Sequence, residues 1–286
     1  MDELSARRGS KLGVLLRVGI FAFLAMAGLF LFAPLMMPVA GYVAASVFST
    51  FAAAAVANAA ALRIYERGRL ADIGLGWTNA SIRNLGVGVA GGLGAAVLVL
   101  GLPLLLRVAE FRRDPAVEPT WGGMLFLTII LLFGAIGEEM LFRGYGFQVL
   151  LASAGRFATI LPVSVLFAAA HGTNANITTL GLLNTMLWGV LLAWAFLRSG
   201  DLWLPIGLHY GWNVALPFFG VTLSGFRMGV TGYAMEWKAG RLWSGGDYGP
   251  EGGLLTTMVL AALFYFLVKA PVRRQAPFLL RGAGEE

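Results

Sequence analysis

The feature that most constrains the fold of this chain is a series of long apolar segments, each close to the length that crosses a bilayer. A membrane-spanning helix needs roughly 20 predominantly apolar residues. Backbone polar groups in lipid must be satisfied within the segment, so such segments form helices. The apolar segments are 14–37, 41–62, 85–106, 121–143, 158–171, 177–197, 202–220 and 253–269. We therefore predict an all-α fold, a polytopic membrane helical bundle of about eight transmembrane helices.

The composition agrees with a membrane protein and excludes several other classes. Hydrophobic residues make up 58% of the 286 residues and charged residues 13%, against about 45–50% and about 25% in soluble domains. The net charge of +6 comes without a basic run interleaved with aromatic residues, so we expect the lipid bilayer and no nucleic acid as partner. The absence of cysteine excludes disulfides and thiolate metal sites. No long polar stretch divides the apolar segments, so residues 1–286 are predicted to form a single integral membrane domain.

The distribution of basic residues predicts the orientation in the membrane. Cytoplasmic loops carry an excess of lysine and arginine. These residues concentrate in the N-terminal tail, in loop 63–84 and in the C-terminal tail, whereas loops 107–120 and 221–252 balance bases against acids. An even number of crossings puts the three basic segments on one side, which predicts an N-in/C-in topology. The excess of arginine over lysine and the many alanines and glycines are typical of GC-rich bacterial genomes, so we expect the bacterial inner (cytoplasmic) membrane.

Loop 221–252 is long for a connection between helices of a bundle, where 2–8 residues are usual. It contains Tyr233, Trp237, Trp243 and Tyr248 among many glycines. Tyrosine and tryptophan are enriched at membrane–water interfaces. We interpret the segment as an interfacial loop with aromatic anchors, with a lid over an entry path as the alternative.

A few ionisable residues lie inside the predicted spanning segments. The run GAIGEEMLFRG contains Glu138, Glu139 and Arg143, and the only two histidines, His171 and His209, lie in two later segments. An ionisable side chain at membrane depth costs a few kcal/mol or more and is a functional-site candidate by default. Two acids, one arginine and both imidazoles in such segments indicate chemistry inside the bilayer.

The spacing of these residues predicts which side chains share a helix face. Residues four apart lie on one face, and adjacent residues diverge by about 100°. Glu139 and Arg143 are therefore expected to pair along their helix, which leaves Glu138 pointing elsewhere. His209 and Asn213 are also four apart and are expected to present one face together.

These residue types suit hydrolysis by an activated water. A glutamate in an apolar site can serve as a general base near neutral pH. One histidine can share the activation of the water, and a second histidine can join Asn213 in donating hydrogen bonds to a developing oxyanion. This set can hydrolyse an acyl or peptide bond without a nucleophilic side chain.

The same residues carry a resemblance to a known family. The motifs occur in order on three apolar segments, as Glu138-Glu139-x-x-x-Arg143, Phe167-x-x-x-His171 and His209-x-x-x-Asn213. This arrangement resembles the CPBP family, which comprises CAAX prenyl endopeptidases and bacteriocin-processing, Abi-type membrane proteases. The resemblance covers roughly residues 121–220, which would form the catalytic core.

The resemblance implies an intramembrane endopeptidase that cleaves near a membrane-associated or C-terminal segment. Glu138 and His171 would activate the water, and His209 and Asn213 would form the oxyanion hole. The supporting residues would be Glu139, Arg143 and Phe167. The expected partners are a peptide or protein substrate, which can be membrane-anchored, and the lipid bilayer, with no cofactor.

Several alternatives stay open at this point. Two histidines and a glutamate are also a catalytic zinc set, so a Zn²⁺-dependent version of the same protease is one alternative, although the H-E-x-x-H helix is absent. A proton-coupled transporter is another, but no repeated halves are found. A non-catalytic scaffold is the third. Single residues also have plainer explanations, such as a structural ion pair for Glu139–Arg143 and interhelical hydrogen bonding for Asn213.

Overall fold

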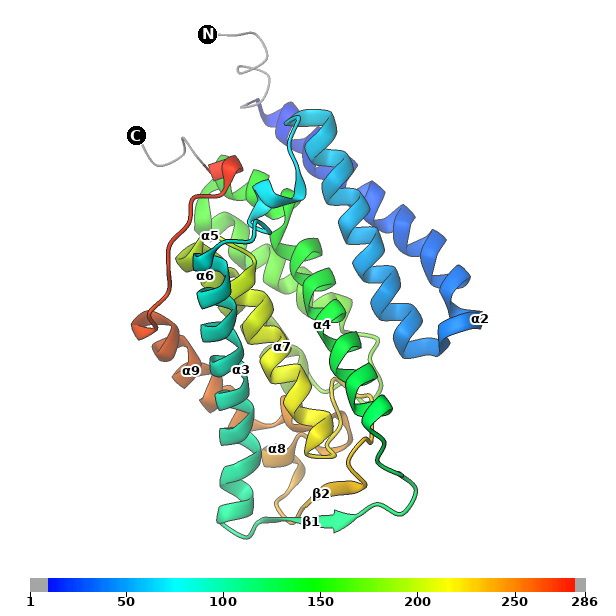
Figure 1. Ribbon diagram of the computed structural model, residues 1–286. Helices are drawn as coiled ribbons and strands as arrows, with labels where there is room; N and C mark the ends of the chain where they lie inside the picture. The colour runs from blue at the N-terminus through cyan, green and yellow to red at the C-terminus, as the bar shows by residue number, and fades with distance from the viewer. Residues whose placement is uncertain (1–9, 281–286) are drawn as a thin grey trace.

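The computed structural model describes residues 10–280 and shows the predicted all-α membrane bundle (Figure 1). Apolar stretches without charge adopt helices because every backbone hydrogen bond is then made locally. The main helices are α2 (Lys11–Tyr65), α3 (Asn79–Leu105), α4 (Trp121–Arg143), α5 (Tyr145–Ala170), α6 (Thr179–Ser199), α7 (Trp203–Phe218) and α9 (Leu254–Lys269). Short elements join them, namely α8 (Arg241–Ser244), η1 (Leu70–Ile73), η2 (Gly246–Tyr248), η3 (Pro250–Gly252) and η4 (Phe278–Leu280).

The first two predicted segments are the two arms of α2. The helix is interrupted at Gly41, which has a φ of 71°, a backbone conformation that glycine adopts without steric cost. Pro38, just before the bend, removes a helical hydrogen bond. The arms run side by side, as Figure 1 shows in blue, and a Cβ on Gly28 of the first arm would meet Ala53 of the second.

The fifth predicted segment, 158–171, is too short, because α5 already begins at Tyr145. The polypeptide breaks at Gly144, where the Asn58 side chain donates to the Met140 carbonyl oxygen and accepts from the Tyr145 backbone N–H. A Cβ at Gly144 would collide with that Met140 oxygen. A second interruption at Gly155, with a φ of 80°, divides α5 into two arms.

The number of membrane crossings and the orientation stay predictions. In the part of the chain that the structure describes, four stretches are long and apolar enough to cross a membrane, namely Lys11–Tyr65, Asn79–Leu105, Trp121–Ala170 and Thr179–Ser199. The first and third of these each contain two arms, and Leu254–Lys269 is a shorter apolar helix. The start of α2 and η4 lie at the same end of the molecule (Figure 1), as an even number of crossings requires.

Helices α3 and α7 pack with their backbones in direct contact. Glycines face each other across this interface, with Gly88 and Gly92 on α3 and Gly207 and Gly211 on α7. A Cβ on any of them would collide with a carbonyl oxygen of the opposite helix. Small residues allow this close approach in membrane bundles. The interface fixes α7, which carries His209 and Asn213.

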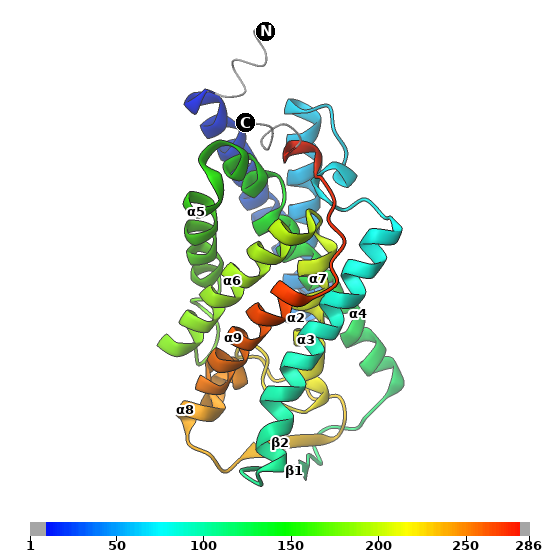
Figure 2. The ribbon, with the colours of Figure 1, turned by 90° about the vertical axis from the view of Figure 1, so that its left-hand side faces the viewer.

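The segment between α7 and α9 is more ordered than a simple interfacial loop. Its strand β2 (Tyr233–Trp237) pairs antiparallel with β1 (Ala109–Arg113) from the connection between α3 and α4. Figure 2 shows this two-stranded sheet at the end of the molecule opposite η4. We call residues 219–253 the outer segment.

Candidate active site

Five of the seven predicted site residues converge on one cavity of about 360 Å³, which Glu139 and Arg143 do not line. Glu138 reaches it from α4, Phe167 and His171 from α5 and its C-terminal end, and His209 and Asn213 from α7. Residues of both arms of α2, of α6 and of the outer segment complete the wall. The spacing of single motifs could not place three helices relative to one another, but the structure brings all five side chains to the same cavity.

Glu138 lies between the two imidazoles. Its Oε2 is 3.8 Å from Nε2 of His171 and 3.9 Å from Nε2 of His209. Both separations are longer than a direct hydrogen bond, and Oε2 has no hydrogen-bond partner within residues 10–280. Polar groups at such separations are suited to share a bridging water. Glu138 is 28% exposed at the side chain.

The orientation of His171 follows from its position at the C-terminal end of α5. It is the C-cap residue, and its Nδ1 lies 2.8 Å from the Phe167 carbonyl oxygen. Since a carbonyl only accepts, Nδ1 carries the proton, and Nε2 of the neutral ring is an acceptor. Phe167 also contacts the ring, with centroids 4.7 Å apart. His171 therefore directs a basic nitrogen toward Glu138.

The predicted pair of Glu139 and Arg143 is present, with 3.2 Å between Nη1 and Oε1. Both side chains are fully buried, and Arg143 also donates to the Gly189 carbonyl oxygen. Its guanidinium lies 4.7 Å from the centroid of the Phe167 ring. The pair is thus built into the packing of α4 against α5 and α6.

Glu139 has a second contact, which sequence spacing could not reveal. Its Oε1 is 2.9 Å from Nδ1 of His209. A carboxylate in this position orients the imidazole and accepts its Nδ1–H, as the acid of a catalytic triad does. When His209 is also protonated at Nε2, it presents an N–H donor to the cavity beside Glu138.

Sequence reasoning missed Glu251, which lies in η3 and lines the same cavity. It is 8% exposed. Its Oε1 accepts from Nε1 of Trp212 at 3.3 Å, and its Oε2 accepts from the backbone N–H and the hydroxyl of Ser224. Burial raises the pKa of the Glu251 carboxyl, and these hydrogen bonds oppose the rise. The sequence around it, GPEGG, looks like an exposed turn and carried no signal.

The outer segment therefore forms one wall of the cavity. Leu223, Ser224, Phe226 and Met228 line it together with Glu251. The interpretation as an interfacial loop with aromatic anchors was incomplete, because Tyr248 is 1% exposed and packs into the protein rather than toward the interface. Within residues 10–280, no group of three or more histidine, aspartate or glutamate side chains is spaced to hold a metal ion.

Residues 120–215 match the family described as type II CAAX prenyl endopeptidase Rce1-like. This part of the chain is similar to that family. The match confirms the resemblance drawn from the motifs, and the matched residues include Glu138, Phe167, His171, His209 and Asn213.

One curated relative is an Escherichia coli protein described as an uncharacterized 24.3 kDa protein, which is 31% identical over 144 residues. The alignment covers 50% of this chain and 62% of that relative. No solved structure matches the chain.

Proposed function

We propose that this protein is an intramembrane endopeptidase, a CAAX-type (CPBP) peptide hydrolase. The observation that carries the proposal is the position of the Glu138 carboxylate, with Nε2 of His171 at 3.8 Å and Nε2 of His209 at 3.9 Å, in a cavity enclosed by apolar helices. The Rce1-like match over residues 120–215 supports it independently.

The first step is the activation of water. A water held between Oε2 of Glu138 and Nε2 of His171 gives its proton to the carboxylate as its oxygen attacks the carbonyl carbon of the substrate. General-base catalysis of this kind requires groups within hydrogen-bond reach of the water. His171 accepts through Nε2 because its Nδ1–H is held by the Phe167 carbonyl.

The second step is the stabilisation and collapse of the tetrahedral intermediate. The carbonyl oxygen becomes an oxyanion, which accepts hydrogen bonds from the Asn213 amide and from the protonated Nε2 of His209. The C–N bond then breaks, and protonated Glu138 returns its proton to the leaving amine. Hydrogen-bond donors that are already oriented stabilise the oxyanion most strongly in a site with little water. The contact with Glu139 orients His209 in this way.

The proposed substrate is a peptide or protein segment near a membrane surface or within it, in keeping with the bilayer around the cavity. We place the protein in the bacterial inner membrane with both ends in the cytoplasm. A zinc-dependent version of the same reaction is the alternative that the residue types allow, since two histidines and a glutamate form a catalytic zinc set, but their spacing within residues 10–280 does not favour it. Zinc would require nitrogen and oxygen ligands at about 2.0–2.2 Å from the metal.

The test compares peptide termini in membranes that contain the wild-type protein or Glu138→Ala. Glu118→Ala, in the connection before α4, is the matched control at equal expression. We expect new termini with the wild type and the control that are absent with Glu138→Ala. Identical termini in all three samples would contradict the proposal and favour a scaffold or transporter.

A further inference from the structure

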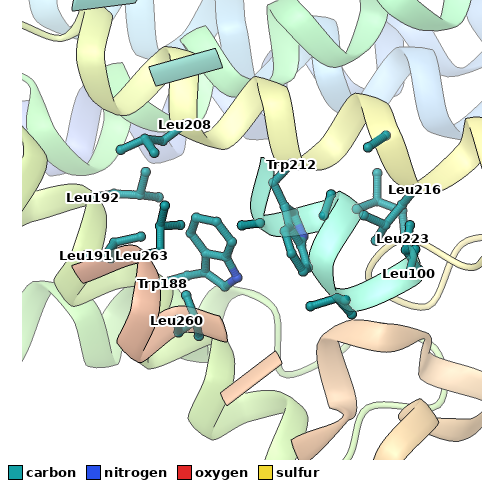
Figure 3. Close-up of a cluster of buried hydrophobic side chains, with 14 of the residues drawn as sticks. Leu100, Trp188, Leu191, Leu192, Leu208, Trp212, Leu216, Leu223, Leu260 and Leu263 are labelled. Atoms are coloured by element: carbon teal, nitrogen blue, oxygen red, sulfur yellow. The ribbon is translucent and has the colours of Figure 1, made fainter. Parts of the chain in front are cut away.

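The end of the cavity formed by the outer segment has features that the proposed reaction does not use. Glu251 and the indoles of Trp188 and Trp212 all line the cavity. Glu251 and Trp212 are in direct contact, with 3.3 Å between Oε1 and Nε1. The two indole centroids are 5.1 Å apart, and Figure 3 shows both rings among leucines of α6, α7 and α9.

Among residues 10–280, no lysine or arginine forms an ion pair with Glu251. The residues that line the cavity include Glu138 and Glu251 but no lysine or arginine. The buried Arg143 is paired with Glu139 and does not line the cavity. The hydrogen bonds to Glu251 come from neutral groups of Trp212 and Ser224. A buried carboxylate without a cationic partner is costly and attracts one.

A carboxylate beside indole rings is the chemistry that binds an ammonium or guanidinium group. Trp212 turns its Nε1–H edge toward Glu251, so the carboxylate would attract the cation while the indoles form an apolar wall along the alkyl stem of the side chain. Trp188 is 7% exposed, and its Nε1–H has no hydrogen-bond partner within the described residues. That N–H is therefore free to donate to a carbonyl oxygen of a peptide bound beside Glu251.

This group of side chains is close to the proposed reacting centre. Trp212 lies three residues after His209 and next to Asn213, so it is one helical turn from the proposed oxyanion donors. Glu251 and His171 line the same cavity. A substrate residue that reaches Glu251 is thus within a few residues of the bond that is cleaved.

We propose that Glu251, Trp188 and Trp212 form a subsite for a cationic side chain, a lysine or an arginine, of the peptide substrate. The subsite deepens the proposed function and rests on it. It predicts that the substrates are peptides with a basic residue near the cleaved bond, and that an acidic residue in the same place is excluded.

The test uses N-acetylated, C-amidated peptides derived from a sequence whose cleavage depends on Glu138. Lysine, glutamine or glutamate is placed in turn at each position flanking the cleaved bond. At one position we expect kcat/KM to be at least ~10-fold higher for the lysine peptide than for the glutamine peptide, which corresponds to a difference of about 1.4 kcal/mol in activation free energy. The glutamate peptide should have the lowest kcat/KM. The Kd of the same peptides on Glu138→Gln should follow the same order without turnover.

Variants then assign the preference to Glu251. In Glu251→Gln the lysine-to-glutamine ratio should fall toward one, whereas Glu236→Gln, an exposed acid of the same outer segment, should keep the wild-type ratio. Equal kcat/KM and equal Kd for lysine and glutamine at every position of the wild type would overturn the subsite. That result would leave Glu138-dependent cleavage intact, so it differs from failure of the proposed function. A lysine preference that persists in Glu251→Gln would also overturn it.

Discussion

At the scale of single residues, two adjacent glutamates of α4 occupy opposite environments. Glu138 is 28% exposed and faces the cavity, whereas Glu139 is fully buried against Arg143 and His209. Successive helical residues diverge by about 100° because a turn takes 3.6 residues. The dipeptide thereby places one carboxylate in the cavity, where we propose that it acts as the base, and another against the imidazole of His209.

Asn213 should act on turnover more than on substrate binding. As the proposed donor to the oxyanion, it would interact with the transition state, so Asn213→Ala should lower kcat by about 10²–10³ with little change in KM. Steady-state kinetics on purified protein measures both constants, and Asn79→Ala, at the exposed start of α3, is the control. A large rise in KM at unchanged kcat would instead assign Asn213 to substrate binding.

The Glu139–Arg143 pair should affect stability and activity in separable ways. Glu139→Leu leaves the Arg143 charge buried without a carboxylate, which costs about 3–5 kcal/mol, and Arg143→Leu leaves Glu139 buried with His209 as its remaining partner. The double variant Glu139→Leu/Arg143→Leu should recover most of that stability in thermal unfolding. Its kcat should stay low, because Nδ1 of His209 has lost its carboxylate. Recovery of wild-type kcat in the double variant would show that the pair is only structural.

Sequence spacing predicted residue contacts only within one helix. Residues four apart gave the pairing of Glu139 with Arg143 and placed His209 with Asn213. The bond from His209 to Glu139 joins residues 70 positions apart. It depends on how α4 packs against α7, which no local pattern encodes.

At the scale of helices, the position of α7 depends on its glycine contacts with α3. The carbonyl oxygen of Leu208 stands where a Cβ of Gly92 would be, so Gly92→Ala must push the helices apart. We expect a lower unfolding temperature in detergent and reduced activity. Gly94→Ala, on the same helix with nothing within 4 Å of its Cβ position, should be neutral or slightly stabilising, since alanine favours helix. Equal unfolding temperatures for the two variants would contradict the interlocked packing.

Helix existence was predictable and helix interruption was not. Each predicted apolar segment lies largely in a helix, because a bilayer admits few other structures. The start of α5 at Tyr145 escaped prediction because the break at Gly144 depends on Asn58, a residue of α2 that is far away in the sequence. The side-chain amide replaces backbone partners that the helix loses at this point.

At the scale of the whole molecule, the outer segment completes the cavity over the helices. Strands β1 and β2 pair residues more than 100 positions apart, and Glu251 reaches the cavity through contacts with Ser224 and Trp212. Its aromatic residues among many glycines predicted an interfacial loop, with a lid over an entry path as the alternative. The features that define it are long-range contacts, so it had to be seen in the structure.

The orientation can be tested with single cysteines, because the chain contains none. Arg69→Cys lies in the basic connection before α3, and Asp247→Cys lies in the outer segment. For an N-in/C-in protein, a membrane-impermeant maleimide added to intact cells should label only the cysteine at position 247. After lysis it should label both. Labelling of position 69 in intact cells would reverse the proposed topology.

The central claim is that Glu138 activates the attacking water without a metal, and one kinetic measurement tests it directly. Purified protein in liposomes would cleave a peptide identified from the membrane termini, with and without a strong zinc chelator. We predict equal kcat for the wild type and Glu236→Gln in both conditions, and a kcat for Glu138→Gln at least ~10²-fold lower. Cleavage by Glu138→Gln at the wild-type rate would contradict the account, and loss of wild-type activity with the chelator would establish the zinc-dependent alternative.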